Sequence, residues 1–294
     1  MRLLTSIIAL LLACVGSRAQ LTYQAEDSIR VESLLSRAAS QHAGSETAQL
    51  VMFFAQELQG VPYVAKTLEV NSREKLVVNL RELDCTTYVE TVLALALTAR
   101  HDSWRFADYC RWLRKLRYSA GVLDGYASRN HYFSQWITSN EHQGLVTELV
   151  GDAADSRGAY YPFVELQCIQ LNWMTTHVSS YPMMVGRTAV IERVRRAEQA
   201  ASGTTVHYIP RRLLNRGKAD IGCVHDGDVL AIVTNKSGLD TSHLGFAVWG
   251  SDGQLHLLNA SQIHKKVVLE PMTLATYMSK HPTQLGVRAV RLKP

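Results

Sequence analysis

The sequence lacks the signatures of several common hydrolase classes. It has no HExxH and no CxxC, so the usual ligand spacing of a zinc hydrolase is missing, and it has no GxSxG serine-hydrolase elbow. After the first twenty residues no apolar run is long enough to span a membrane. Lys and Arg form no continuous stripe, so the net charge of +5 is no nucleic-acid footprint. We therefore expect no metal, no cofactor, no nucleic-acid partner and no transmembrane span.

Cysteine is scarce, with five residues in a chain of 294. A chain of this length can bury a core without a disulfide scaffold. Exported proteins usually pair their cysteines. Four cysteines, at irregular spacings, lie beyond the N-terminal stretch: Cys85, Cys110, Cys168 and Cys223. They allow one bridge, two or none, and the sequence does not choose between these states.

The N-terminus has the pattern of a signal peptide over residues 1–19. Arg2 precedes an apolar stretch at residues 3–15, and Ser17-Arg18-Ala19 places small residues where a signal peptidase cuts. Leu11-Leu12-Ala13-Cys14 also resembles a lipobox, in which Cys14 would carry a lipid anchor. Either alternative predicts an exported, periplasmic protein. Loss of Arg2 and Arg18, with no acidic residue in the stretch, lowers the net charge from +5 to +3.

The remaining residues, 20–294, predict one catalytic domain of α+β class. Apolar residues recur at helical intervals over 26–58, and Asp84 is a good N-cap for a helix that runs to Arg100. Residues from about 104 to 205 read as a helical inserted lobe. Strands are then expected at 228–233, 244–249, 254–260, 266–269 and 287–292. Helices that precede a run of strands favour α+β over alternating βαβ units.

Cys85 is a candidate nucleophile because it would occupy the first turn of the helix that Asp84 caps. Unpaired N–H groups and the positive dipole end at that position stabilise a thiolate, so we expect a lowered pKa for Cys85. The same N–H groups can form an oxyanion hole. The alternative is that Cys85 is a small buried hydrophobe, as most free cysteines are.

His243 is the best candidate for the base that a cysteine nucleophile needs. It begins an expected strand, and Gly245 leaves room beside it on the same face. A three-residue turn ending at Gly253 would place His243 opposite Ser261, with Asn259 on its face and His256 on the other. Asn259 would then orient the imidazole. A one-residue slip would exchange the roles of Asn259 and His256.

Four motifs together carry a family resemblance. They are Gly60-Val61-Pro62-Tyr63, Leu83-Asp84-Cys85-Thr86-Thr87-Tyr88-Val89-Glu90, Asp226-Gly227-Asp228-Val229-Leu230 and Thr241-Ser242-His243-Leu244-Gly245. In this order they resemble the NlpC-type branch of the papain-like cysteine peptidases, and more narrowly its N-acetylmuramoyl-L-alanine amidase-like family. Ser128-Arg129-Asn130-His131-Tyr132 and Tyr208-Ile209-Pro210 extend the resemblance to roughly residues 45–294.

The resemblance implies a Cys-bearing helix packed on an antiparallel, barrel-like sheet that carries the histidine. Cys85 and His243 match the family's catalytic pair, and Asn259 matches a third position that is often His. Oxyanion or substrate-binding positions fall on Tyr63, Asp84, Ser128, Arg129, His131 and Ser242.

The function that the resemblance implies is cleavage of the amide between the lactyl group of N-acetylmuramic acid and L-Ala. The partners would be peptidoglycan fragments, bound by a monomer. Three alternatives stay open: a D,L-endopeptidase that cuts γ-D-Glu–diamino acid bonds, a non-catalytic wall-binding protein of the same fold, and a transglutaminase-like acyl transferase. The preferred glycan end is not specified.

Overall fold

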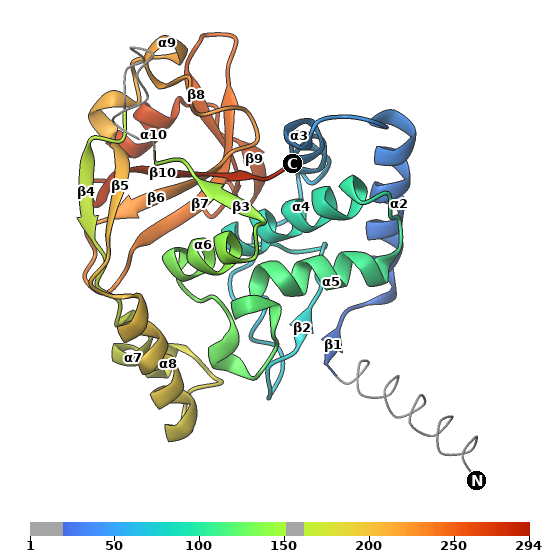
Figure 1. The fold of residues 1–294 in the computed structure, drawn as a ribbon, viewed down its shortest axis with the longest axis vertical. Helices are drawn as coiled ribbons and strands as arrows, with labels where there is room; N and C mark the ends of the chain where they lie inside the picture. Colours follow the sequence, from blue (N-terminus) through green and yellow to red (C-terminus); the bar gives the residue numbers. More distant parts are fainter. Residues whose placement is uncertain (1–19, 151–161) are drawn as a thin grey trace.

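A computed structural model describes residues 20–150 and 162–294 (Figure 1). The expected signal peptide and the lipobox cysteine Cys14 lie outside these residues. The helices are Ala25–Gln41 (α2), Thr47–Glu57 (α3), Cys85–Arg100 (α4), Phe106–Arg117 (α5), Phe133–His142 (α6), Trp173–Thr176 (α7), Thr188–Ala201 (α8), Lys218–Ile221 (α9) and Leu274–Ser279 (α10). Short 3-10 turns span Ser119–Gly121 (η1), Tyr126–Ser128 (η2), Val178–Ser180 (η3) and Arg211–Leu213 (η4).

The strands form a small two-stranded sheet and one large sheet. Leu21–Thr22 (β1) and Leu76–Val77 (β2) pair in parallel. The large sheet comprises Val146–Glu148 (β3), Glu165–Cys168 (β4), Thr205–Pro210 (β5), Val229–Thr234 (β6), Thr241–Trp249 (β7), Leu255–Ser261 (β8), Lys266–Leu269 (β9) and Gln284–Leu292 (β10). Its order is β4-β5-β10-β6-β7-β8-β9, with β3 on β10, and every pair is antiparallel.

The expectation of a barrel-like sheet is wrong, because the sheet stays open. Its outermost strands, β4 and β9, do not pair with each other. The α+β class is confirmed. The segment predicted as a helical lobe, residues 104–205, is not entirely helical, because it contains β3 and β4, which join the sheet. Figure 1 shows α7 and α8 projecting from the sheet, while α5 and α6 lie with the main helices.

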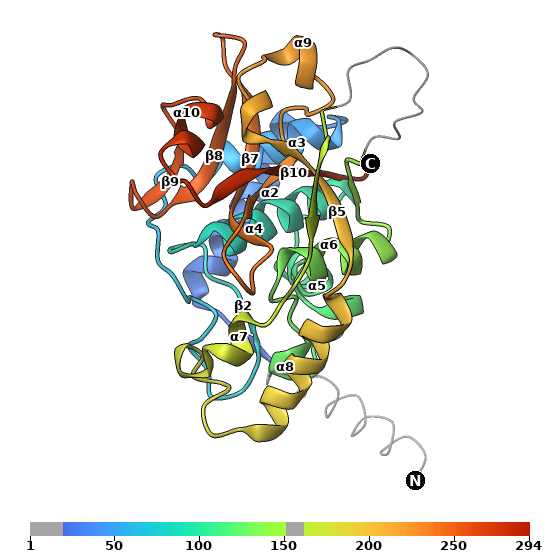
Figure 2. The same ribbon diagram turned by 90° about the vertical axis from the view of Figure 1, so that its left-hand side faces the viewer.

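Two hydrophobic cores lie on opposite faces of the large sheet. Side chains from α2 to α6 pack on one face, where Ala231, Leu244 and Phe246 point toward the helices. The other face, with Leu230 and Ile232, is covered by η4, α9 and α10. Figures 1 and 2 show this arrangement, with α4 running beside β7. The alternation along β6 and β7 follows from the two-residue period of a strand.

The helix α4 begins where the sequence predicts, because Asp84 caps it. The Asp84 carboxylate accepts from the Thr87 backbone N–H at 2.8 Å, and the Thr87 hydroxyl accepts from the Asp84 N–H at 2.9 Å. This reciprocal capping box satisfies free N–H groups of the first turn. One turn along, the Tyr88 ring meets Phe246 of β7 edge to face, with centroids 5.5 Å apart. Cys85 is thereby held at the end of α4, beside the sheet.

The β7–β8 hairpin has the predicted register. Phe246 lies opposite Leu258 and Trp249 opposite Leu255, and continuation of this register places His243 opposite Ser261. The turn is closed by Gly253, which has a φ of +70° and donates its N–H to the Gly250 carbonyl at 3.0 Å. Glycine adopts this left-handed conformation without steric cost. The slip that would exchange Asn259 and His256 is therefore excluded.

Candidate functional site

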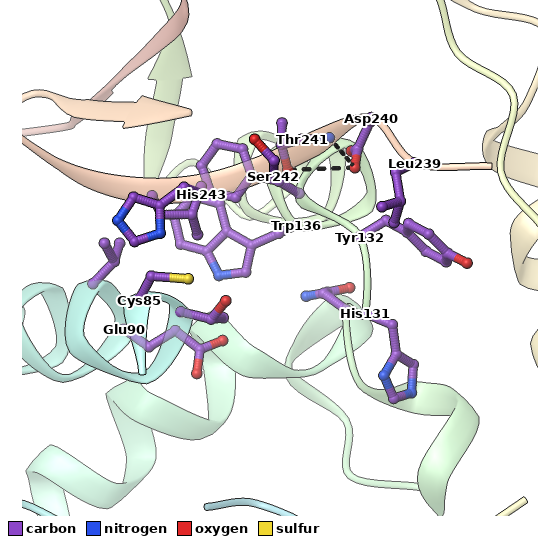
Figure 3. Close-up of a pocket in the computed structure, with 15 residues that line it drawn as sticks. Cys85, Glu90, His131, Tyr132, Trp136, Leu239, Asp240, Thr241, Ser242 and His243 are labelled. Carbon is purple, nitrogen blue, oxygen red and sulfur yellow. Dashed lines mark hydrogen bonds between the residues drawn. The ribbon is translucent and has the colours of Figure 1, made fainter. Parts of the chain in front are cut away.

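A pocket lies at the junction of α4, α6 and β7. Cys85 lines it from the helix and His243 from the strand, and Figure 3 shows the imidazole directly beside the thiol. The complete lining is Cys85, Thr86, Val89, Glu90, Asn130, His131, Tyr132, Phe133, Trp136, Leu239, Asp240, Thr241, Ser242, His243 and Leu244. Residues far apart in the sequence thus bring a thiol and an imidazole to one cavity.

Asn259 holds the imidazole of His243 from the neighbouring strand. The His243 Nε2–H donates to Asn259 Oδ1 at 2.8 Å, and Asn259 is fully buried. Because Nε2 carries the hydrogen, the second ring nitrogen, Nδ1, is left as a proton acceptor. The predicted contact between these two side chains is present. His256, the alternative, bonds instead to the Glu270 carbonyl and to Asp252.

The expected lowering of the Cys85 pKa is wrong. Burial raises the pKa of the thiol to about 12, and the negative charge of Asp84 adds to the rise. Hydrogen bonds with Thr86 and with the backbone of Leu244 oppose the shift but are smaller. Desolvation penalises the charged form of any acid, and here it outweighs the helix end. The free protein therefore holds Cys85 as a neutral thiol.

His243 is neutral as well. Burial lowers its pKa below the ordinary value of 6.5, although the bond to Asn259 acts in the opposite direction. The two groups are therefore a neutral imidazole beside a neutral thiol, not a preformed thiolate–imidazolium ion pair, and a neutral imidazole is able to accept a proton.

Three other predicted residues lie near this pair. Tyr63 pairs with Leu83 in an isolated bridge. Burial is the main cause that raises its pKa to about 12, and the neighbouring acidic groups Cys85 and Asp84 add to the rise. Asp84 acts as the cap of α4. Ser242 is exposed and lines the pocket beside His243.

The predicted positions at residues 128–131 separate in the structure. His131 lines the pocket, whereas Ser128 and Arg129 do not. The Ser128 hydroxyl donates to the Gly125 carbonyl at 2.7 Å, closing a turn. The Arg129 guanidinium is buried between Glu69 and Glu74, at 2.7 and 2.6 Å. The contacts that the structure gives these two side chains are internal to the protein.

Several lining residues were not predicted. The indole of Trp136 and the carboxyl groups of Glu90 and Asp240 face or border the cavity (Figure 3). Glu90 pairs with buried Arg117 at 2.6 Å, and Asp240 accepts from the Ser134 backbone N–H at 2.6 Å. Glu90 could have been predicted to line the pocket, because it is the last residue of the motif that begins at Leu83. No local sequence pattern indicated Asp240.

The four described cysteines, Cys85, Cys110, Cys168 and Cys223, are all free. Within residues 20–150 and 162–294, no group of three His, Cys, Asp or Glu side chains is placed to hold a metal ion. Among the same residues, no helix is long and apolar enough to cross a membrane.

Comparison with known proteins assigns the family. The AmiA-like family model, described as N-acetylmuramoyl-L-alanine amidase-like, matches residues 53–287. A crystal structure of an N-acetylmuramoyl-L-alanine amidase from Bacteroides uniformis is 32% identical, with a TM-score of 0.76, and the match covers 84% of this chain and 99% of that one. A Bacteroides fragilis structure, provisionally named a xylanase, is 36% identical, with a TM-score of 0.73 and coverage of 81% and 99%.

A Legionella pneumophila structure shares the fold at 22% identity, with a TM-score of 0.68 and coverage of 95% of this chain and 97% of that one. No curated protein sequence matches the chain. The family model spans most of the described domain, including both Cys85 and His243. The chain therefore belongs to the N-acetylmuramoyl-L-alanine amidase-like family.

Proposed function

We propose that the protein is a cysteine amidohydrolase of peptidoglycan, with Cys85 as nucleophile, His243 as general base and acid, and Asn259 as the residue that orients His243. The observation that carries this proposal is the placement of the Cys85 thiol beside an imidazole whose Nε2–H is held by Asn259. A Cys-His-Asn set in which the Asn bonds to the His ring is typical of papain-like peptidases, so we place the core among them.

The first half of the reaction forms an acyl-enzyme. As the Cys85 sulfur attacks the amide carbon, its proton passes to Nδ1 of His243, and the carbonyl oxygen becomes an oxyanion. We assign the stabilisation of that charge to the backbone N–H groups of the first turn of α4 that the Asp84 cap leaves unpaired, together with the neutral hydroxyl of Tyr63. His243 then gives its proton to the leaving nitrogen as the C–N bond breaks.

The second half is hydrolysis. His243 takes a proton from water as the water oxygen bonds to the acyl carbon. The thioester C–S bond breaks, and the proton returns to the Cys85 sulfur. This two-step route replaces one slow amide hydrolysis with two lower barriers.

The bond proposed for cleavage joins the lactyl group of N-acetylmuramic acid to L-Ala. The family description and the name of the Bacteroides uniformis relative support this choice. The acyl part then lies on the sugar side and the amine leaves with the stem peptide. We further propose that the protein acts as a monomer in the periplasm on wall fragments, after export through residues 1–19. N-terminal sequencing of the mature protein distinguishes cleavage after Ala19 from lipidation at Cys14.

Digestion of defined muropeptides, followed by mass spectrometry, tests the function. Wild type should release complete stem peptides, and Cys85→Ser should release none while unfolding at the wild-type temperature. Shortened stems would identify a D,L-endopeptidase, and incorporation of an added amine would identify an acyl transferase. Full activity in Cys85→Ala would refute the cysteine mechanism.

A further inference from the structure

A buried carboxylate lies behind Asn259, on the side away from His243. Glu270 directly follows β9 and is 1% exposed. Its Oε1 accepts from Asn259 Nδ2 at 3.3 Å and from the Ser261 hydroxyl at 3.1 Å. Its Oε2 lies 3.1 Å from Nε2 of His264, whose side chain is 34% exposed. A chain of polar contacts therefore runs from His243 through Asn259 and Glu270 to the surface.

We propose that Glu270 is a positioning residue for the reaction: it fixes the amide of Asn259 in the one orientation that leaves Nδ1 of His243 free to accept the thiol proton. This inference rests on the proposed Cys85–His243 mechanism, and it assigns the residue that keeps the base in its working tautomer.

The side-chain amide of Asn259 has two chemically different ends, an oxygen that accepts and an NH2 group that donates. Asn259 can present either its oxygen or its NH2 group to His243. With the oxygen toward the ring, Nε2 carries the hydrogen and Nδ1 accepts. With the NH2 group toward the ring, Nε2 must accept, so the hydrogen moves to Nδ1, beside the thiol. In that tautomer His243 cannot take the proton of Cys85.

An ionised carboxylate decides between the two orientations because it accepts hydrogen bonds and cannot donate one. Facing Glu270, only the NH2 group of Asn259 makes a favourable contact, since the amide oxygen would oppose a negative charge. The other acceptors for Nδ2 are the carbonyls of Leu257 and Val268, at 3.4 and 3.5 Å. These bonds are longer and uncharged, so Glu270 supplies the strongest constraint.

Glu270 is itself held in place. Its carboxylate also contacts Ser261 and His264, and the backbone N–H of Glu270 donates to the Leu257 carbonyl at 2.9 Å. A carboxylate buried to this degree is tolerated only when such donors surround it. A substitution that removes the charge of Glu270 but keeps its volume therefore tests the positioning role.

The test is a double-mutant cycle with Glu270→Gln and Asn259→Ala. Glutamine keeps the volume of Glu270 but can present either end to Asn259, so kcat should fall by on the order of tenfold, with KM within about twofold. In the Asn259→Ala background the same change should alter kcat by less than about twofold, because Glu270 acts through Asn259. Additive losses, or wild-type kcat in Glu270→Gln, would overturn the proposal.

The matched control is Asp228→Asn. Asp228 is another carboxylate buried to 2% exposure, and it pairs with Arg291 at 2.7 Å, away from the pocket lining. This variant should lose thermal stability and keep the wild-type kcat. If Asp228→Asn and Glu270→Gln lowered kcat alike, the effect would reflect general destabilisation and the positioning role would fail.

A second readout separates this inference from the proposed substrate. The rate of Cys85 alkylation by iodoacetamide, followed by peptide mass spectrometry, needs no muropeptide. A slower rate in Glu270→Gln, unchanged in Asp228→Asn, supports the positioning role even if wild type cleaves no muropeptide. Equal alkylation rates in wild type, Glu270→Gln and Asp228→Asn, together with cleavage of muropeptides, would support the proposed function and refute the positioning role of Glu270.

Discussion

Two histidines line the same pocket in different surroundings, and we propose only His243 as the base for Cys85. His243 and His131 are both kept neutral by burial, which lowers the pKa of His131 to about 3. The Nε2–H of His131 donates to the Tyr126 carbonyl at 2.8 Å, and its ring packs against that of Tyr126. His243 instead bonds to a side chain on the next strand and lies beside the thiol. A lowered pKa therefore shows only that both rings are buried. What distinguishes His243, and supports its proposed role, is the thiol beside it.

Replacing each of the two histidines in turn is the most direct test of the difference between them. His243→Ala should lower kcat by about a thousandfold or more, because the thiol then has no base. His131→Gln should lower kcat by less than about tenfold, because that side chain touches no reacting atom. Muropeptide turnover at saturating substrate measures both. Comparable losses would mean that the pocket uses both imidazoles, contrary to the geometry.

Gly245 tests whether His243 depends on the packing around Asn259. A Cβ at Gly245 would lie 2.8 Å from the Leu258 carbonyl oxygen and 2.9 Å from Cβ of Asn259, so Asn259 must shift. Gly245→Ala should lower kcat by about tenfold and the free energy of unfolding by about 1–3 kcal/mol. Gly44→Ala is the control, because Gly44 has a φ of +74° but nothing within 4 Å of an added Cβ. Gly44→Ala should lower the free energy of unfolding but leave kcat unchanged.

The pH dependence of kcat/KM sharpens the distinction between the two rings. His243 must be neutral to accept a proton, and burial lowers its pKa, so activity should persist below pH 6.5 and fall at a more acidic value. The acidic limb should be the same in His131→Gln. An acidic limb above pH 6.5, or one that moves in His131→Gln, would contradict this assignment.

The smallest expected effect concerns stability. His131 stays neutral in the folded state down to about pH 3, whereas in the unfolded chain it takes up a proton near its ordinary value of 6.5. The unfolded state therefore binds more protons between these values, and stability falls as the pH drops through that window. Urea unfolding at about pH 7 and pH 4.5 should show that His131→Gln loses about 2 kcal/mol less than wild type. Equal losses would show that His131 titrates alike in both states.

Much of the fold was predictable because its signals are local. Asp84 and Thr87 set the start of α4 within one turn, and Gly253 sets the hairpin turn that fixes the β7–β8 register. The contact of Asn259 with His243 followed from that register and the two-residue period of strands.

The features that escaped prediction depend on distant packing. β4 is only four residues long, and its apolar residues Leu166 and Cys168 are exposed. Its pairing with β5 joins Glu165 to Tyr208 across 43 residues. The rise in the Cys85 pKa comes from the walls of the pocket, which other elements build around the helix end. Glu270 contacts Asn259 only because β8 and β9 pair. The residues that neighbour Glu270 in the sequence give no sign that its carboxylate is buried.

The edge-to-face contact of Tyr88 with Phe246 has a consequence for how the family can diverge. Each ring lies three residues from one member of the Cys85–His243 pair, so the two rings act as a spacer between the layer that carries sulfur and the layer that carries imidazole. A smaller ring partner would let the layers approach, and a larger one would part them. Substitutions at positions 88 and 246 should therefore compensate each other in volume among active relatives, although neither side chain lines the pocket.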